Sequence, residues 1–157
     1  MACARRNLER RAAPPLTLWV QYGIASKHLP SRQRLRAWAQ AALLGEAQVT
    51  LRVVGAREGR SLNRAFRGQD HATNVLTFAY PESRPLSGDI VLCAPVIARE
   101  AREQRKPVDA HYAHLVVHGM LHLQGYAHDN NKDAAIMETL EAHIVLKLGY
   151  ANPYAHR

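Results

Sequence analysis

Short stretches in which hydrophobic and polar residues alternate, or in which β-branched residues predominate, predict four strands. The stretch LTLWVQY alternates, and a period of two places successive side chains on opposite faces of a sheet. The stretch QVTLRVV is rich in β-branched residues, which favour an extended backbone. The predicted strands cover residues 16–22, 48–54, 73–80 and 88–93.

Apolar residues at helical spacing predict five helices among and after these strands. They cover residues 31–44, 58–66, 95–106, 109–124 and 132–148. Ser31 is expected to cap the first helix and Asp109 the fourth, because short oxygen-bearing side chains accept hydrogen bonds from free backbone N–H groups. Gly149 is expected to end the last helix. The predicted apolar face of that helix consists of Ile136, Leu140, Ile144 and Leu148.

The resulting order of elements is β-α-β-α-β-β-α-α-α. It predicts an α/β (α+β) fold with a four-stranded mixed sheet covered by about five helices. A chain of 157 residues fits one domain with one core. We expect this domain to cover residues 14–157, preceded by a flexible basic tail at residues 1–13 that contains Arg5, Arg6, Arg10 and Arg11.

Composition favours a cytoplasmic protein that has no contact with a membrane. No apolar run approaches the ~20 residues of a membrane span. The basic N-terminus is followed only by the apolar stretch 16–20, which is shorter than the core of a signal peptide. Cys3 and Cys93 lie far apart and form no disulfide or CxxC pattern.

The charge balance points to a polyanionic partner. Twenty-one Lys and Arg residues face thirteen Asp and Glu residues, which gives a net charge of +8, and seventeen of the basic residues are Arg. The planar guanidinium matches phosphate oxygens, whereas the Lys ammonium acts as a point charge. Nucleic acid is therefore a candidate partner.

The densest chemistry lies in the segment HYAHLVVHGMLHLQGYAH, residues 111–128. His118 and His122 are one helical turn apart, about 6 Å of axial rise, so both can face one ion. His128 would face away from them in a continuous helix. Gly125 permits the left-handed conformation that ends a helix and reverses the chain, so His128 can return to the same ion. Three imidazoles leave a coordination position open for water, as in catalytic zinc sites.

The pattern H-x-x-x-H-x-x-G-x-x-H has the spacing of metzincin peptidases. In those enzymes a Glu follows the first His and serves as the general base. Here that position is Gly119. The sequence therefore retains a metal cage but lacks the base of a peptidase.

Two segments of the chain resemble the YbeY family of metal-dependent endoribonucleases. AHLVVHGMLHLQGYAHD at residues 113–129 is similar to the family signature HGxLHLxGYDH, and SLNRAFRGQDHATNVLTF at residues 61–78 is similar to LNxxYRxKDxxTNVLSF. GDI at residues 88–90 and LGYANPY at residues 148–154 also agree. The resemblance implies an α/β fold and a single-strand-specific endoribonuclease that acts in ribosomal RNA maturation and ribosome quality control.

The resemblance also implies the residues of the site. His118, His122 and His128 would bind one Zn²⁺ per chain, and Arg67 and His118 would be the catalytic residues. The implied partners are single-stranded ribosomal RNA precursors and the ribosome or ribosome-associated proteins. The family commonly has Asp before the third His, where this chain has Ala127. Asp129 is an alternative carboxylate at this end of the motif.

Arg67 and Asp89 each allow a structural and a functional interpretation. Arg67 would either pair with Asp70 on the surface or clamp the scissile phosphate. Asp89 would either orient a ligand histidine or cap a turn.

Three further positions near the predicted site also allow more than one role. Thr73 and Asn74 could bind phosphate or ribose, but starting a strand is the favoured interpretation. His114 is expected to form hydrogen bonds near the site without binding the metal. Four other histidines are expected to lie away from the triad: His28, His71, His143 and His156.

Three functional hypotheses follow from these residues. The leading one is a zinc-dependent endoribonuclease. The second is a zinc peptidase, favoured by the spacing and opposed by Gly119 and the basic charge. The third is a ribosome assembly factor whose zinc is structural. The sequence does not identify a general base.

Overall fold

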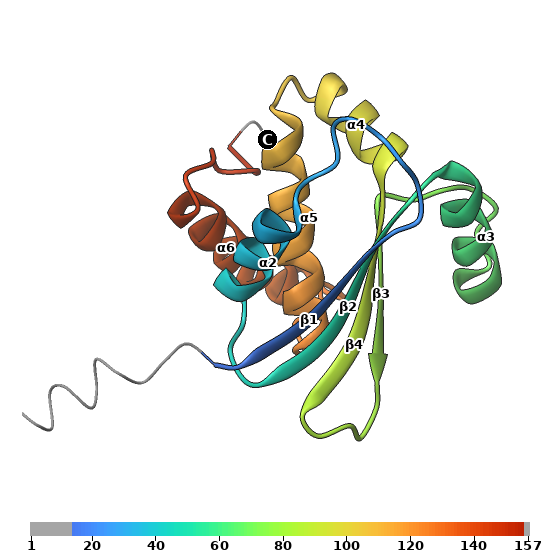
Figure 1. Cartoon of the computed structure of the whole chain (residues 1–157). Coiled ribbons are helices and arrows are strands. Elements are labelled where there is room, and N and C mark those ends of the chain that lie inside the picture. The colour runs from blue at the N-terminus through green and yellow to red at the C-terminus, as the bar shows by residue number, and fades with distance from the viewer. Residues whose placement is uncertain (1–13, 156–157) are drawn as a thin grey trace, which may run out of the picture.

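A computed structural model describes residues 14–155 and contains a four-stranded mixed sheet (Figure 1). The strands lie in the order β1-β2-β4-β3, with β1–β2 and β2–β4 parallel and β3–β4 antiparallel. Their bounds are β1 (Leu16–Tyr22), β2 (Ala47–Val54), β3 (Val75–Tyr80) and β4 (Leu86–Cys93). The predicted fold class is confirmed. The predicted tail at residues 1–13 lies outside the described residues.

Within residues 14–155, five helices accompany the sheet: α2 (Arg32–Ala41), α3 (Ala56–Arg67), α4 (Ala94–Glu103), α5 (Val108–Leu123) and α6 (Asn131–Lys147). Helix α5 is central, because it contacts β3, β4 and the helices α2, α4 and α6. In Figure 1, α2, α5 and α6 lie together on one side of the sheet, and α3 stands apart from them beyond β3. Helix α5 therefore lies between the sheet and α6.

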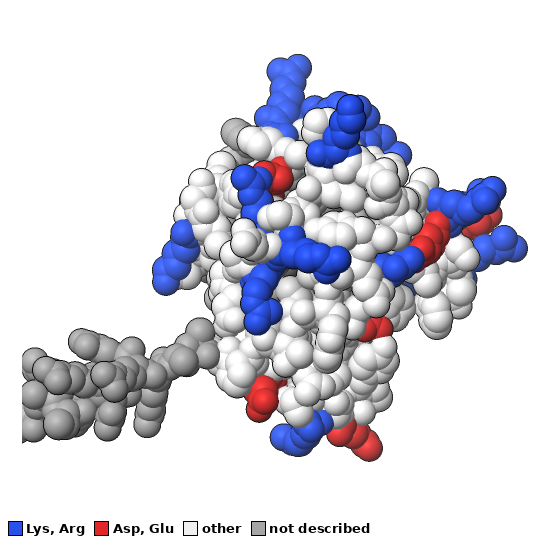
Figure 2. Space-filling view, viewed as in Figure 1, with Lys and Arg blue, Asp and Glu red and all other residues white. Residues whose placement is uncertain are grey.

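Among the charged side chains on the face seen in Figure 2, those of Lys and Arg are more widespread than those of Asp and Glu. On α3, Arg57, Arg60, Arg64 and Arg67 are all exposed. None of the helices within residues 14–155 is long and apolar enough to cross a membrane.

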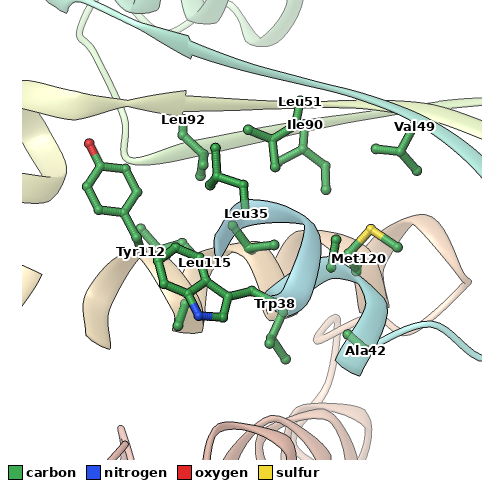
Figure 3. Close-up of a cluster of buried hydrophobic side chains, with 14 of the residues drawn as sticks. Leu35, Trp38, Ala42, Val49, Leu51, Ile90, Leu92, Tyr112, Leu115 and Met120 are labelled. Carbon is green, nitrogen blue, oxygen red and sulfur yellow. The ribbon is translucent and has the colours of Figure 1, made fainter. Parts of the chain in front are cut away.

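The main core lies between the sheet and α5 and explains why α5 is apolar on most sides. Ile90 and Leu92 of β4 point into this core, and α5 contributes residues that include Leu115 and Met120 (Figure 3). Each fully buried side chain of this size contributes about 1.5–3 kcal/mol. Val91 belongs to a smaller cluster under α3, because alternate residues of a strand face opposite sides of the sheet. The sheet thereby separates α3 from α5.

Several helix bounds differ from the prediction, and at the end of α2 and the start of α5 side chains from distant elements contact the residues concerned. Helix α2 ends at Ala41, before the predicted Leu44. The Gln124 amide donates to the Ala42 carbonyl at 2.8 Å and accepts from the Leu44 N–H at 2.7 Å, so it binds the backbone groups that a longer helix would use. Asp109 does not cap α5. The cap position is Pro107, and Asp109 lies in the first turn, paired with Arg34 of α2.

The buried face of α6 also differs from the predicted one. Ile136 is 50% exposed, whereas Met137 is buried. Ile144 is buried as predicted, but its buried neighbours are Glu141 and Val145. Leu140 and Leu148, which were also predicted, are partly buried against the main core, so only Ile136 was wrong. The buried face is shifted toward Met137 and includes the fully buried carboxylate of Glu141.

Candidate metal centre

The predicted triad comes together at the end of α5. The Nε2 atoms of His122 and His128 are 3.2 Å apart, and the rings of His118 and His128 are stacked with centroids 5.5 Å apart. Each of the three side chains offers one nitrogen, and these nitrogens all lie within 4.8 Å of one another. Among the described residues this is the only such group of three or more potential ligands.

The turn after α5 brings His128 back, as the sequence predicted. Gly125 has φ of +102°, a conformation that side-chain-bearing residues rarely adopt. The N–H of Tyr126 donates to the Leu121 carbonyl at 3.0 Å, and that of Gly125 to the His122 carbonyl at 3.1 Å. These bonds satisfy the last carbonyls of the helix and reverse the chain.

The donor set suits a metal ion, and one ligand pair has the spacing of a tetrahedral site. Tetrahedral zinc with Zn–N bonds of 2.0–2.1 Å requires ligand nitrogens about 3.3 Å apart, close to the separation of 3.2 Å between His122 and His128. Burial lowers the pKa of His122, and the neighbouring His118 and His128 lower it further. The imidazole of His122 is therefore held in the neutral form that binds metals.

A buried carboxylate supports this cluster. Glu141 of α6 is fully buried. Its Oε1 lies 2.5 Å from Nδ1 of His118, and its Oε2 lies 2.9 Å from Nε2 of His114. The hydroxyl of Tyr154 donates to the same Oε2. Burial alone would raise the pKa of Glu141, but the hydrogen bonds from His114, His118 and Tyr154 outweigh it and hold the pKa at about 2.

His114 occupies the place that the sequence predicted, bonded near the site and outside the triad. Sequence reasoning missed Glu141 and Tyr154. A signal for Glu141 was available, since it lies one turn from Met137 and from Val145 on the same face of α6. An acidic residue in a buried helical stripe needs a partner, and His114 and His118 supply it.

Gly119 faces the sheet. A Cβ built there would lie 3.2 Å from Cδ1 of Ile90 and 3.3 Å from Cγ2 of Thr77. A side chain at the position that carries the general base in peptidases would therefore be crowded against Ile90 and Thr77. This packing explains the glycine and opposes a peptidase mechanism.

Arg67 reaches the free edge of β3. It lies at the end of α3 and donates through Nη2 to the Thr77 carbonyl at 2.7 Å. Its guanidinium carbon lies 5.4 Å from the ring centroid of Phe78. The Cγ2 of Thr77 in turn packs toward Gly119, the neighbour of His118. One residue of β3 thus contacts both the arginine and the helix of the histidine cluster.

Three interpretations considered for site residues were wrong. Asp70 does not pair with Arg67, because both of its carboxylate oxygens accept from Arg60, at 2.8 and 2.9 Å. Asp89 neither orients a ligand histidine nor caps a turn. It lies within β4 and accepts from the hydroxyl of Tyr80.

Asn74 immediately precedes β3, which begins at Val75, two residues after the predicted start. Its Oδ1 accepts from the N–H of Val75 at 2.7 Å, and its Nδ2 donates to Glu100 at 2.9 Å. His111 also contacts Glu100, at 2.9 Å. These contacts join β3, α4 and α5 away from the triad.

The other histidines expected to lie outside the site do so where they are described. His28, His71 and His143 are exposed and belong to no group of potential ligands among residues 14–155. His156 lies outside the described residues. Asp129 is exposed.

The fold and the three converging imidazoles define a class: an α/β protein with a candidate metal centre of the open, three-histidine kind used by hydrolases. Comparison with known proteins then places the chain more narrowly. The family described as "Endoribonuclease YbeY" matches residues 25–149, and the chain belongs to this family.

Two relatives agree with that placement, and a solved structure supports the fold alone. The chain is 56% identical over 147 residues to "Endoribonuclease YbeY" of Aromatoleum aromaticum, covering 92% of this chain and 96% of the relative. It is 56% identical over 135 residues to the protein of that name from Nitrosomonas eutropha, covering 86% and 96%. The solution structure of TM1509 from Thermotoga maritima shares the fold, with a TM-score of 0.54 and 22% identity, covering 89% of this chain and all of that one.

Proposed function

We propose that this protein is a zinc-dependent endoribonuclease that cleaves single-stranded RNA, chiefly ribosomal RNA precursors, in the cytoplasm and in association with the ribosome. The observation that carries the proposal is the triad of His118, His122 and His128 in a chain whose relatives are named endoribonucleases. The net charge of +8 supports a polyanionic substrate.

The three imidazoles would hold one zinc ion per chain. When bound there, zinc supplies Lewis-acid chemistry toward a phosphoryl oxygen. The residues of the chain provide the rest: neutral imidazoles as ligands, and a buried carboxylate behind His118. His118 would contribute to catalysis only as a ligand of the metal.

Arg67 would bind the phosphate at the point of cleavage. Its bond to Thr77 and its position over Phe78 restrict the guanidinium to one region of the β3 edge. A restricted guanidinium loses less entropy on binding a phosphate, and its other N–H groups can form charge-assisted hydrogen bonds. Donors held in place before reaction stabilise charge that develops in the transition state.

The test compares Arg67→Ala with Arg64→Ala, an exposed arginine of the same helix one turn earlier. Single-turnover cleavage of single-stranded RNA should fall about 10²–10³-fold in Arg67→Ala and remain near the parent rate in Arg64→Ala. RNA affinity should fall modestly and similarly in both, because one contact among many carries little of the binding. Zinc content should not change in either.

A parent-like cleavage rate of Arg67→Ala at saturating RNA would remove Arg67 from the catalytic assignment. The same preparations should be incubated with casein as a comparison substrate. RNA cleavage that is lost with a chelator, together with intact casein, supports the proposed reaction. Chelator-sensitive cleavage of casein would overturn it in favour of a peptidase.

A further inference from the structure

A shared carboxylate connects three separate parts of the chain behind the histidine triad. Glu141 comes from α6, His114 and His118 from α5, and Tyr154 from the segment after α6. Glu141 has no exposed surface, so its oxygens bind protein groups rather than bulk water. We propose that Glu141 is a positioning residue that fixes the tautomer and direction of His118 and thereby sets the affinity of the triad for zinc. This inference rests on the metal site of the proposed function.

The first step of the argument is the identity of the bonded nitrogen. A carboxylate accepts hydrogen bonds, so the 2.5 Å contact between Nδ1 of His118 and Oε1 of Glu141 requires the proton to be on Nδ1. A neutral imidazole with its proton on Nδ1 has its free electron pair on Nε2. His118 therefore offers Nε2 to an ion, as a ligand nitrogen must be unprotonated.

The second step is that Glu141 is itself held in place. Its other oxygen, Oε2, is 2.9 Å from Nε2 of His114 and accepts from the Tyr154 hydroxyl. His114 and Tyr154 also contact each other, with Nε2 and the hydroxyl 3.2 Å apart. A buried carboxylate without such partners would be strongly destabilising. The two partners on Oε2 leave Oε1 directed at His118.

The third step is the expected magnitude. A carboxylate that accepts from the far nitrogen of a ligand histidine raises the basicity of the histidine and restricts its ring, and removing such a partner typically weakens metal binding about 10–100-fold. Because the same carboxylate bonds His114, the restriction extends one turn back along α5. Glu141→Gln should therefore weaken zinc binding while keeping the size of the side chain.

The experiment measures zinc affinity by competition with a chromophoric chelator in the full chain. Glu141→Gln should raise the zinc dissociation constant about tenfold or more. Tyr154→Phe, which removes the hydroxyl that contacts both Glu141 and His114, should raise it by a smaller factor. Glu46→Gln, the same substitution at an exposed site before β2, serves as the control and should bind zinc like the parent.

A second readout does not depend on metal. Long-range ¹⁵N–¹H correlation spectra of the metal-free protein report which ring nitrogen of His118 carries the proton. The parent should show the proton on Nδ1, and Glu141→Gln should show a mixture of tautomers. If Glu141→Gln fails to fold, Tyr154→Phe and the parent spectrum still decide the question.

The inference is overturned if Glu141→Gln binds zinc with the parent's affinity, or if His118 of the metal-free parent carries its proton on Nε2. RNA cleavage is assayed separately on the zinc-loaded parent. A parent that binds zinc but leaves RNA intact would overturn the proposed function, while the affinity and spectral readouts would still decide the role of Glu141.

Discussion

The turn at Gly125 gives a sharp test of how the triad is assembled. A side chain added at Gly125 would meet no atom within 4 Å, but the residue has φ of +102°. Gly125→Ala therefore adds backbone strain without a steric clash in the surroundings. A left-handed conformation costs a residue with a Cβ about 1–2 kcal/mol.

The location of this strain determines what it affects. The segment from Gly125 to Asn130 contains no helix or strand and has exposed residues, so it can relax when no metal holds it. Zinc binding must then restore the turn to bring His128 back. A strain of about 1–2 kcal/mol in the bound state corresponds to a zinc dissociation constant about 5–30-fold higher.

Gly68→Ala is the matched control. Gly68 ends α3, has φ of +69° and likewise has no atom within 4 Å of an added Cβ, but it is not followed by a metal ligand. Both variants are measured by zinc competition and by chemical denaturation without metal. Gly68→Ala should lose stability and keep the parent's zinc affinity. Parent-like zinc affinity of Gly125→Ala would refute the argument that this turn positions His128.

Two further predictions concern the triad and the peptidase position. His122→Ala should reduce bound zinc from about one per chain to a trace by elemental analysis, because two imidazoles remain of three; undiminished zinc would contradict the ligand assignment. Gly119→Glu should lower stability by about 3 kcal/mol or more, because a carboxylate would be forced against Ile90 and Thr77. Thermal denaturation should show Tm lower by about 10 °C, and no casein hydrolysis should appear. A variant of parent stability would contradict the packing described for Gly119.

The triad was predictable because its geometry is local. All three ligands lie within residues 118–128, so the pitch of one helix and one glycine turn fix their relative positions. The four strands were predictable for a similar reason, since alternation and β-branched residues act over a few neighbouring positions. Strand order and helix ends needed more than local information.

The features that were missed depend on how distant elements dock. Gln124, at the C-terminal end of α5, binds the backbone groups just after α2. No pattern within residues 31–44 predicts this contact. Asp70 forms its ion pair with Arg60 rather than with Arg67, although both arginines belong to α3. The choice between two arginines of one helix is settled by side-chain directions in the folded chain, not by distance along the sequence.

The candidate site combines both kinds of information, and this explains why α6 is needed. The ligands of α5 and its turn set where the imidazoles meet, but nothing local decides which nitrogen of His118 faces the others. That choice comes from Glu141, more than twenty residues further along the chain, at 2.5 Å from Nδ1. Docking of α6 on α5 buries Met137 and Val145 on either side of Glu141. The apolar contacts that stabilise the helix pair therefore also place the carboxylate beside His118. Metal affinity and the packing of α6 should therefore change together: a substitution that loosens this helix pair without touching a ligand should also weaken zinc binding.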